Sequence, residues 1–149
     1  MMIRPLQESD KSEWLRLRHR LWPDASLDEL AAEVNDYQGE DAKTIVLVCE
    51  RESGGLQGML EVSIRAYAEG CNTNHVGYLE GWYVDVDVRR QGVGRALVEA
   101  AENWAIAQGC TEMASDTEID NLLSQKAHAQ IGYAEVERIV CFKKDLKRE

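Results

Sequence analysis

Hydrophobic and polar positions recur with two different periods along the chain, and these periods predict a mixed α/β fold. Helical spacing of apolar residues predicts helices over residues 10–22, 92–108 and 119–131, and a further helix that begins near Ser26 and includes Val34. Alternating or continuous β-branched runs predict strands over residues 2–5, 43–49, 56–64, 76–88 and 111–115, with a last strand or strand pair over 134–143. The order β-α-α-β-β-β-α-β-α-β predicts an α/β (α+β) domain, a mixed central sheet flanked by helices.

The length of the chain, 149 residues, predicts a single domain over residues 1–149. A chain of this size buries enough surface to fold without disulfides or a structural metal. No linker rich in proline, glycine or serine interrupts it. Its three histidines and four cysteines lack the spacing of metal ligands, so we expect no metal site.

The charge of the chain excludes two classes of partner. Its 17 basic and 27 acidic residues give a net charge of −10 at neutral pH. Nucleic acid and anionic membranes repel such a surface, so neither is an expected partner. The N-terminus lacks the apolar stretch of a signal peptide, and the four cysteines are widely spaced. These features predict a protein of the reducing cytoplasm.

One short segment reverses the sign of the charge. Arg89, Arg90 and Arg95 surround Gly92 and Gly94, after a predicted strand and at the start of a predicted helix. Bare backbone amides at a helix start, together with the positive end of the helix dipole, attract anions. Glycine allows the backbone to approach such an anion closely. The segment therefore predicts a ligand that carries phosphate, although an ordinary strand-to-helix turn with surface arginines has the same composition.

The glycine segment also carries a family resemblance. A Walker loop is absent, and Leu97 stands where a dinucleotide fingerprint requires its third glycine. Arg-x-x-Gly-x-Gly at 89–94, with Gly132-Tyr133 after the next helix, resembles the acetyl-CoA pyrophosphate loop of the GCN5-related N-acetyltransferases. The resemblance covers nearly the whole chain. It implies the fold of that family and acetyl-CoA as cosubstrate.

The resemblance implies which residues bind acetyl-CoA. The backbone amides of the glycine loop would hold the pyrophosphate, the end of the fourth strand would pair with the pantetheine arm, and Asn121 would contact the pantetheine amides. A simple polar role for Asn121 in the first helical turn is compatible with this. The implied set is Trp82, Tyr83, Val84, Arg89, Arg90, Gln91, Gly92, Val93, Gly94, Arg95 and Asn121.

His128 stands where the family often has a tyrosine, four residues before Gly132. In the family this tyrosine is the usual candidate for protonating the departing thiolate. Histidine also has a pKa suited to proton transfer. Alternatively, His128 is a partly buried polar residue that bonds Ser124, one helical turn earlier.

An amine acceptor requires acidic groups, and three acids are candidates. Glu80 lies inside an apolar strand, where a regular alternation places it on the same face as Trp82, and an ammonium group would offset the cost of burying its charge. Asp116 ends the fifth strand, where ligand clefts form, but it is also a candidate helix N-cap. Glu137 stands next to Arg138, with which it could form a surface ion pair.

A narrower resemblance rests on five strings: Leu21-Trp22-Pro23, Tyr78-Leu79-Glu80-Gly81-Trp82, Glu112-Met113-Ala114-Ser115-Asp116-Thr117, Ser124-Gln125-Lys126 and Glu135-Val136-Glu137-Arg138. Together they are similar to the type I aminoglycoside 6′-N-acetyltransferases, which inactivate antibiotics such as kanamycin and tobramycin by direct transfer in a ternary complex. The similarity implies that the acceptor site consists of Trp22, Tyr67, Glu80, Asp116 and Glu137. Tyr67 would come from a neighbouring subunit, which implies a homodimer.

Several alternatives stay open at this level. Glu80 is either a general base or a group that only orients the amine. Trp22 could be a core aromatic residue, and Tyr67 an exposed loop residue. The chain could acetylate a polyamine, a protein N-terminus or a lysine. It could also be a module that binds acyl-CoA without catalysis, although Glu80 and Asp116 have little purpose there.

Overall fold

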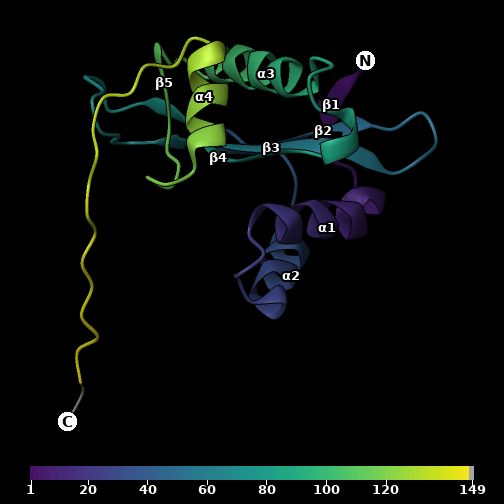
Figure 1. The fold of residues 1–149 in the computed structure, drawn as a ribbon, viewed down its shortest axis with the longest axis horizontal. Helices are drawn as coiled ribbons and strands as arrows, with labels where there is room; N and C mark the ends of the chain where they lie inside the picture. The colour runs from purple at the N-terminus through teal and green to yellow at the C-terminus, as the bar shows by residue number, and fades with distance from the viewer. Residues whose placement is uncertain (148–149) are drawn as a thin grey trace. The chain divides into compact units, whose positions relative to one another are not determined.

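The computed structural model describes residues 1–147, and its helices and strands follow the predicted order as far as the last helix (Figure 1). The chain divides into two compact units, Met1–Asp116 and the residues from Thr117 onward. None of the described helices is both long and apolar enough to cross a bilayer. The elements are β1 (Ile3–Pro5), η1 (Glu8–Asp10), α1 (Lys11–Leu21), α2 (Leu27–Asp36), β2 (Thr44–Glu50), β3 (Leu56–Arg65), β4 (Val76–Val84), η2 (Val86–Val88), α3 (Val93–Ala107), β5 (Glu112–Ser115) and α4 (Leu122–Gln130).

The first unit is built on a mixed sheet, which confirms the predicted fold class. Its strands lie in the order β1-β2-β3-β4-β5. Neighbours from β1 to β4 are antiparallel, whereas β5 runs parallel to β4. A parallel pair needs a crossover connection, and α3 supplies it between β4 and β5.

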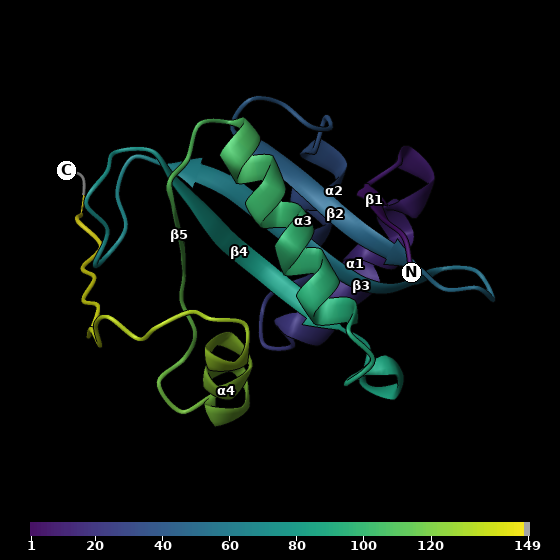
Figure 2. The same cartoon turned by 90° about the horizontal axis from the view of Figure 1, so that it is seen from above.

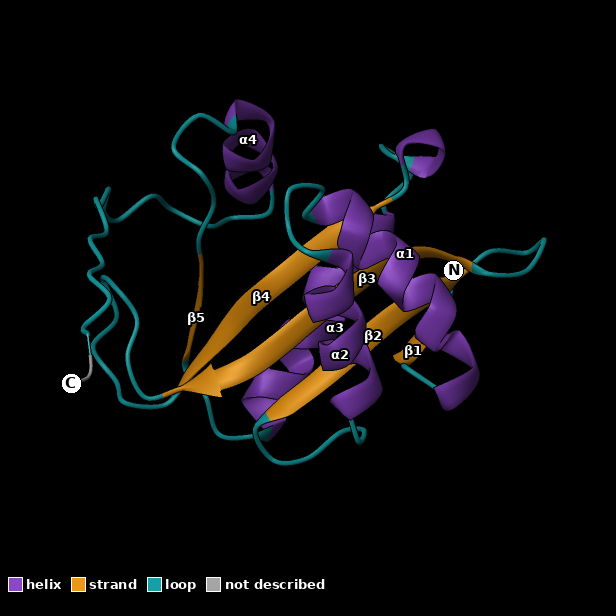
Figure 3. Ribbon diagram, turned by 90° about the horizontal axis from the view of Figure 1, so that it is seen from below, coloured by secondary structure: helices purple, strands orange, loops and turns teal. Residues whose placement is uncertain are grey.

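Helices cover both faces of this sheet. Figure 3 shows α1 and α2 on one face, and Figure 2 shows α3 running across the other. Leu17 of α1 is fully buried against Val48 and Met59 of the sheet. On the other face, the fully buried Leu97 of α3 lies close to Gly58 of β3. The two faces each have an apolar core, as expected for an amphipathic helix on a two-sided sheet.

A β-bulge in β4 changes the predicted orientation of Glu80. Gly81 pairs with Glu61 and Leu79 with Val62, so Glu80 is an extra residue in its strand. A bulge interrupts the alternation of side chains. Glu80 consequently contacts Ser63, on the side of the sheet that Gly81 and α1 share. The expectation that Glu80 shares a face with Trp82 is wrong, because that expectation assumed a regular strand.

The fourth strand is shorter than predicted. The alternating sequence at 84–88 suggests that the strand continues, but β4 ends at Val84 and residues Val86–Val88 form the 3-10 helix η2. The side chain of Asp85 explains the break, because it is buried and bonded to two arginines instead of facing solvent.

The last predicted strand is also wrong. Residues 134–143 are described without helix or strand. A strand requires a neighbour to satisfy its backbone groups. The apolar side chains that made this segment strand-like are instead exposed, by 64% at Val136, 77% at Val140 and 92% at Phe142.

Candidate active site

The connection between β4 and α3 forms a loop suited to an anion. Gly92, at the N-cap of α3, has φ +87°, and Arg90 has φ +64°. Only glycine adopts such a φ without strain, so the sequence signal at Gly92 has a structural cause. In the described chain, the first turn of α3 has no acidic residue and no side chain that caps its amides. These amides and the helix dipole therefore suit an anion, as the sequence leads us to expect.

Gly94 has a different reason for being glycine. A Cβ atom at this position would lie 3.2 Å from Cζ2 of Trp82, which packs against the first turn of α3. The indole of Trp82 thus fixes the start of α3 on β4. Arg89 strengthens the same junction, because its Nε donates to the carbonyl oxygen of Val84 at 2.9 Å and its guanidinium lies 5.4 Å from the ring centroid of Tyr83.

β4 and β5 separate just before the loop. Among the described residues, their pairing runs from Val76 to Leu79 of β4 and stops there. β3 continues to pair with β4 as far as Val84, on the other edge. The β5-facing edge of residues 80–84 therefore has no strand neighbour in the described chain. An extended ligand can add to such an edge through backbone hydrogen bonds.

Two arginines from other parts of the chain hold the β4–α3 loop in place. Arg16 of α1 donates to both carboxylate oxygens of Asp85, at 3.1 and 2.9 Å. Arg51 donates to Asp85 at 2.9 Å and to Asp87 at 2.7 and 2.9 Å. Burial raises the pKa of Asp85, but the hydrogen bonds from both arginines outweigh burial and leave this pKa below its usual value. The network ties the loop to α1 and to the β2–β3 turn.

Asp85→Asn is expected to lower the free energy of unfolding by about 2 kcal/mol, because it leaves two guanidinium groups without a buried charge. A carboxyl whose folded pKa is depressed contributes stability above its unfolded pKa and loses it as pH falls through the folded value. Urea unfolding at several pH values should therefore show the difference between wild type and variant shrinking below about pH 4.

Asp87→Asn is the matched control, since Asp87 binds the same Arg51 but its side chain is 65% exposed. Its unfolding free energy should stay close to that of the wild type. Equal destabilisation by both variants would contradict a special role for the buried carboxylate.

The two candidate acceptor carboxylates, Glu80 and Asp116, belong to one network. Ser63 donates to Glu80, and Arg65 donates to the same carboxylate through Nε at 2.8 Å. The guanidinium of Arg65 lies 3.5 Å from the ring centroid of Tyr78. The hydroxyl of Tyr78 donates to Asp116, and burial together with this carboxylate raises the pKa of Tyr78. The N-cap alternative for Asp116 is wrong, because Asn121 caps α4.

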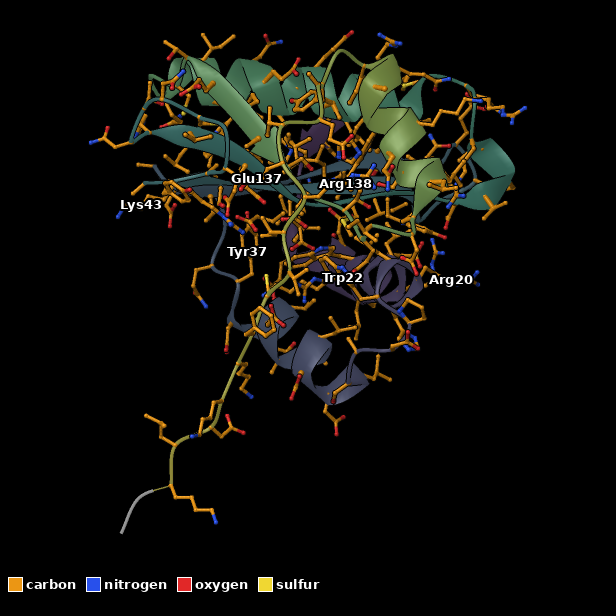
Figure 4. The ribbon with its side chains drawn as sticks, turned by 60° about the vertical axis from the view of Figure 1, so that its left-hand side comes forward. Arg20, Trp22, Tyr37, Lys43, Glu137 and Arg138 are labelled. Carbon is orange, nitrogen blue, oxygen red and sulfur yellow. The ribbon has the colours of Figure 1, made fainter. Side chains whose placement is uncertain are left out.

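The two candidate aromatic residues, Trp22 and Tyr67, lie in different surroundings. Trp22 follows the end of α1 (Figure 4), and a Cβ on Gly81 would come within 2.8 Å of its ring. It therefore packs on the strand that carries Glu80, with the guanidinium of Arg18 5.1 Å from its ring centroid. Tyr67, in the β3–β4 connection, is 69% exposed.

The remaining candidates belong to the second unit. Asn121 accepts a hydrogen bond from the amide of Ser124 at 3.0 Å, which confirms its polar role at the start of α4. His128 Nδ1 lies 2.7 Å from the carbonyl oxygen of Ser124, so the predicted Ser124 contact is confirmed as well. Glu137 lies on the exposed segment after α4 (Figure 4), and Arg138 pairs with Glu135 rather than with Glu137.

Three arginines that organise these sites are not evident from the sequence alone. Arg16 and Arg51 hold the loop, and Arg65 holds Glu80. Ser63 and Arg65 stand two residues apart on one strand, as do Tyr78 and Glu80 on the next. This i, i+2 spacing was the available signal, but the sequence does not give the register between the strands.

The sequence and the fold are similar to those of known proteins. A model of the Acetyltransferase (GNAT) family matches residues 10–133. The aminoglycoside N(6')-acetyltransferase type 1 of Klebsiella aerogenes is 45% identical over 147 residues, 97% of each chain. The crystal structure of the aminoglycoside 6'-N-acetyltransferase AAC(6')-IG from Acinetobacter haemolyticus has a TM-score of 0.91 at 37% identity, and covers 99% of this chain and 100% of its own.

A second solved relative contains ligands. The structure of AAC(6')-Iy, in complex with the bisubstrate analogue CoA-S-monomethyl-acetylneamine, has a TM-score of 0.89 at 33% identity and covers 97% of this chain and 98% of its own. The chain therefore belongs to the GNAT acetyltransferase family, in the group of the type 1 aminoglycoside N(6')-acetyltransferases. Its glycine loop fits the acetyl-CoA that such enzymes use, because the amides at the start of α3 suit a pyrophosphate.

Proposed function

We propose that this protein transfers the acetyl group of acetyl-CoA to the 6′-amino group of aminoglycoside antibiotics of the kanamycin and tobramycin type, and so confers resistance. One observation carries the proposal. In the described chain, the edge of β4 at residues 80–84 has no strand neighbour and leads to the glycine loop, and the same strand carries Glu80 and Tyr78, whose hydroxyl donates to Asp116. A site for an acyl carrier thus lies next to carboxylates that suit a polycation.

The proposed reaction is a direct transfer in a ternary complex. Glu80 removes a proton from the 6′-ammonium group, either directly or through water. The amine nitrogen forms a bond to the thioester carbonyl carbon, and a backbone N–H near Val84 stabilises the oxyanion. The nitrogen then releases its surplus proton to solvent, the C–S bond breaks to give the amide, and the thiolate receives a proton. Positioning of the amine against the thioester supplies much of the rate, because the two groups already react with each other.

His128 is our proposed donor of that proton, with solvent as the alternative source. A carbonyl oxygen can only accept a hydrogen bond, so the contact of Nδ1 with the carbonyl of Ser124 requires hydrogen on Nδ1. The neutral ring then has a lone pair on Nε2. His128 can therefore donate to a thiolate through Nε2 only in its cationic form.

The test is to incubate the purified protein with acetyl-CoA and kanamycin and to follow thiol release. Transfer to the 6′ position predicts release with 6′-amino aminoglycosides and none with their 6′-hydroxyl counterparts. Release with spermidine or a peptide amine alone would favour another amine acetyltransferase. Binding of acetyl-CoA without release on any amine would favour a non-catalytic module.

We propose further that two copies of the chain form a homodimer through the segment after α4. Its apolar side chains Val140, Phe142 and Leu146 are 77%, 92% and 82% exposed. Exposure of this many apolar groups in a short segment is typical of an interface. A dimer would also allow the exposed Tyr67 to reach the acceptor site of a neighbouring subunit, as the family resemblance implies.

Light scattering after size exclusion should give twice the chain mass for the wild type. Phe142→Asp should shift the protein toward the monomer, because a charge replaces apolar surface at the interface. Ile106→Asp is the control, since Ile106 is 67% exposed on α3 and outside this segment. A wild-type monomer at all concentrations would contradict the dimer.

Two further properties complete the proposal. We assign both units to one acetyltransferase domain over residues 1–149, which is supported by a family match that extends from α1 past α4. We place the protein in the cytoplasm, which the free thiols of Cys49, Cys71, Cys110 and Cys141 support.

A further inference from the structure

We propose that Arg65 is a specificity-determining residue of the acceptor site, a built-in counter-ion that competes with the amines of the substrate for Glu80. The inference rests on the proposed function, because it concerns how the same site selects a polycation. It assigns a role to a cation that the reaction scheme above does not use.

The geometry around Glu80 leaves little free acceptor capacity. Arg65 approaches both carboxylate oxygens, Oε2 through Nε at 2.8 Å and Oε1 through Nη2 at 2.5 Å. Ser63 donates to Oε2 as well. A carboxylate offers about four lone-pair positions, and three of them are taken. Among the described residues no donor takes the second position on Oε1, which can accept from an ammonium group or a water molecule.

Arg65 also connects Glu80 to the second acceptor carboxylate. Its guanidinium covers the ring of Tyr78, and the Tyr78 hydroxyl donates to Asp116. The two carboxylates are thus held by one cation and one phenol, on neighbouring strands. Since the side chain of Arg65 is 44% exposed and that of Glu80 is 30% exposed, solvent and substrate can reach the pair.

Two consequences follow from a fixed positive charge at this place. The charge repels every ammonium group of an incoming aminoglycoside, so it weakens binding, most of all for substrates with many amines. The planar guanidinium group of Arg65, with two N–H donors on the carboxylate, also fixes the direction of the remaining lone pair on Glu80. This orientation favours productive alignment with the amine. Arg65 therefore lowers affinity and raises turnover.

The test is steady-state kinetics of Arg65→Met and Arg65→Lys with acetyl-CoA and aminoglycosides that carry different numbers of amines. Arg65→Met removes the charge, so the KM for kanamycin should fall about tenfold and rise more steeply with added salt. Arg65→Lys keeps the charge but loses the bidentate geometry of the guanidinium group. Its KM for kanamycin should therefore stay close to the wild-type value while its kcat falls. The kcat of Arg65→Met should fall too.

For both variants we expect an unchanged KM for acetyl-CoA. If the role of Arg65 were purely structural, its loss would also change that KM, and KM and kcat for kanamycin would not respond separately. An unchanged or higher KM for kanamycin in Arg65→Met overturns the inference, and so does an equal decrease of KM in Arg65→Lys. Thiol release by the wild type separates this result from failure of the proposed function. If the wild type acetylates no aminoglycoside, the proposed function fails first.

Discussion

Gly92→Val is expected to raise the KM for acetyl-CoA by about 100-fold, because it damages the phosphate cradle without touching the acceptor carboxylates. Gly92 has φ +87°, a conformation that a β-branched residue cannot adopt without strain. A Cβ at this position would meet only Met1, at 3.8 Å, so steric overlap is not the cause. The loop must instead change its backbone, and the amides at the start of α3 then no longer converge on the pyrophosphate.

Gly109→Val is the matched control for this substitution. Gly109 follows the other end of α3, has φ +93°, and has nothing within 4 Å of a Cβ. Gly109→Val should lower the stability of the protein about as much as Gly92→Val does, but it should leave the KM for acetyl-CoA unchanged. Isothermal titration with acetyl-CoA and thermal melting would measure both quantities. Equal loss of binding in the two variants would contradict the assignment of the cradle to the Gly92 loop.

Local signals in the sequence predict most of the fold. The spacing of Trp14, Leu17 and Leu21 predicts α1, and the glycines at 92 and 109 mark the two ends of α3 correctly. Such signals depend on neighbouring residues along the chain, so one sequence is sufficient to interpret them.

The errors concern interactions between distant residues. The bulge at Glu80 depends on how β3 and β4 align, which no local pattern specifies. Strand-like alternation at 84–88 does not continue β4, because Arg16 and Arg51 draw Asp85 into a buried network. The segment 134–143 has the pattern of a strand, but a pattern does not supply the neighbour that a strand needs.

The same distinction between local signals and long-range contacts applies to the candidate site. The sequence alone indicates the glycine loop at the start of a helix, Glu80 inside an apolar strand and Asp116 at the end of a strand. Their partners Arg65 and Tyr78 become visible only when the strands are aligned, because the contacts cross from β3 to β4 and on to the end of β5. The sequence thus reveals which groups are available, and the register determines which of them interact.

Glu80→Gln should lower kcat for kanamycin by about 10²–10³-fold, with little change in the KM for acetyl-CoA, if Glu80 removes the proton from the 6′-ammonium. Glutamine keeps the size of the side chain and can accept one bond from Arg65 or Ser63, so the site should stay folded. Only the basic oxygen is lost. The measurement is the rate of thiol release at saturating kanamycin and acetyl-CoA.

Glu52→Gln is the control for the loss of one negative charge, because Glu52 is exposed in the β2–β3 turn. Glu52→Gln should retain wild-type turnover, since salt screens the charge of an exposed side chain outside the site. The response of kcat and of the KM for kanamycin to Glu80→Gln distinguishes the two roles left open for Glu80. A wild-type kcat with only a raised KM for kanamycin would remove Glu80 as the base and leave it as a group that orients the amine.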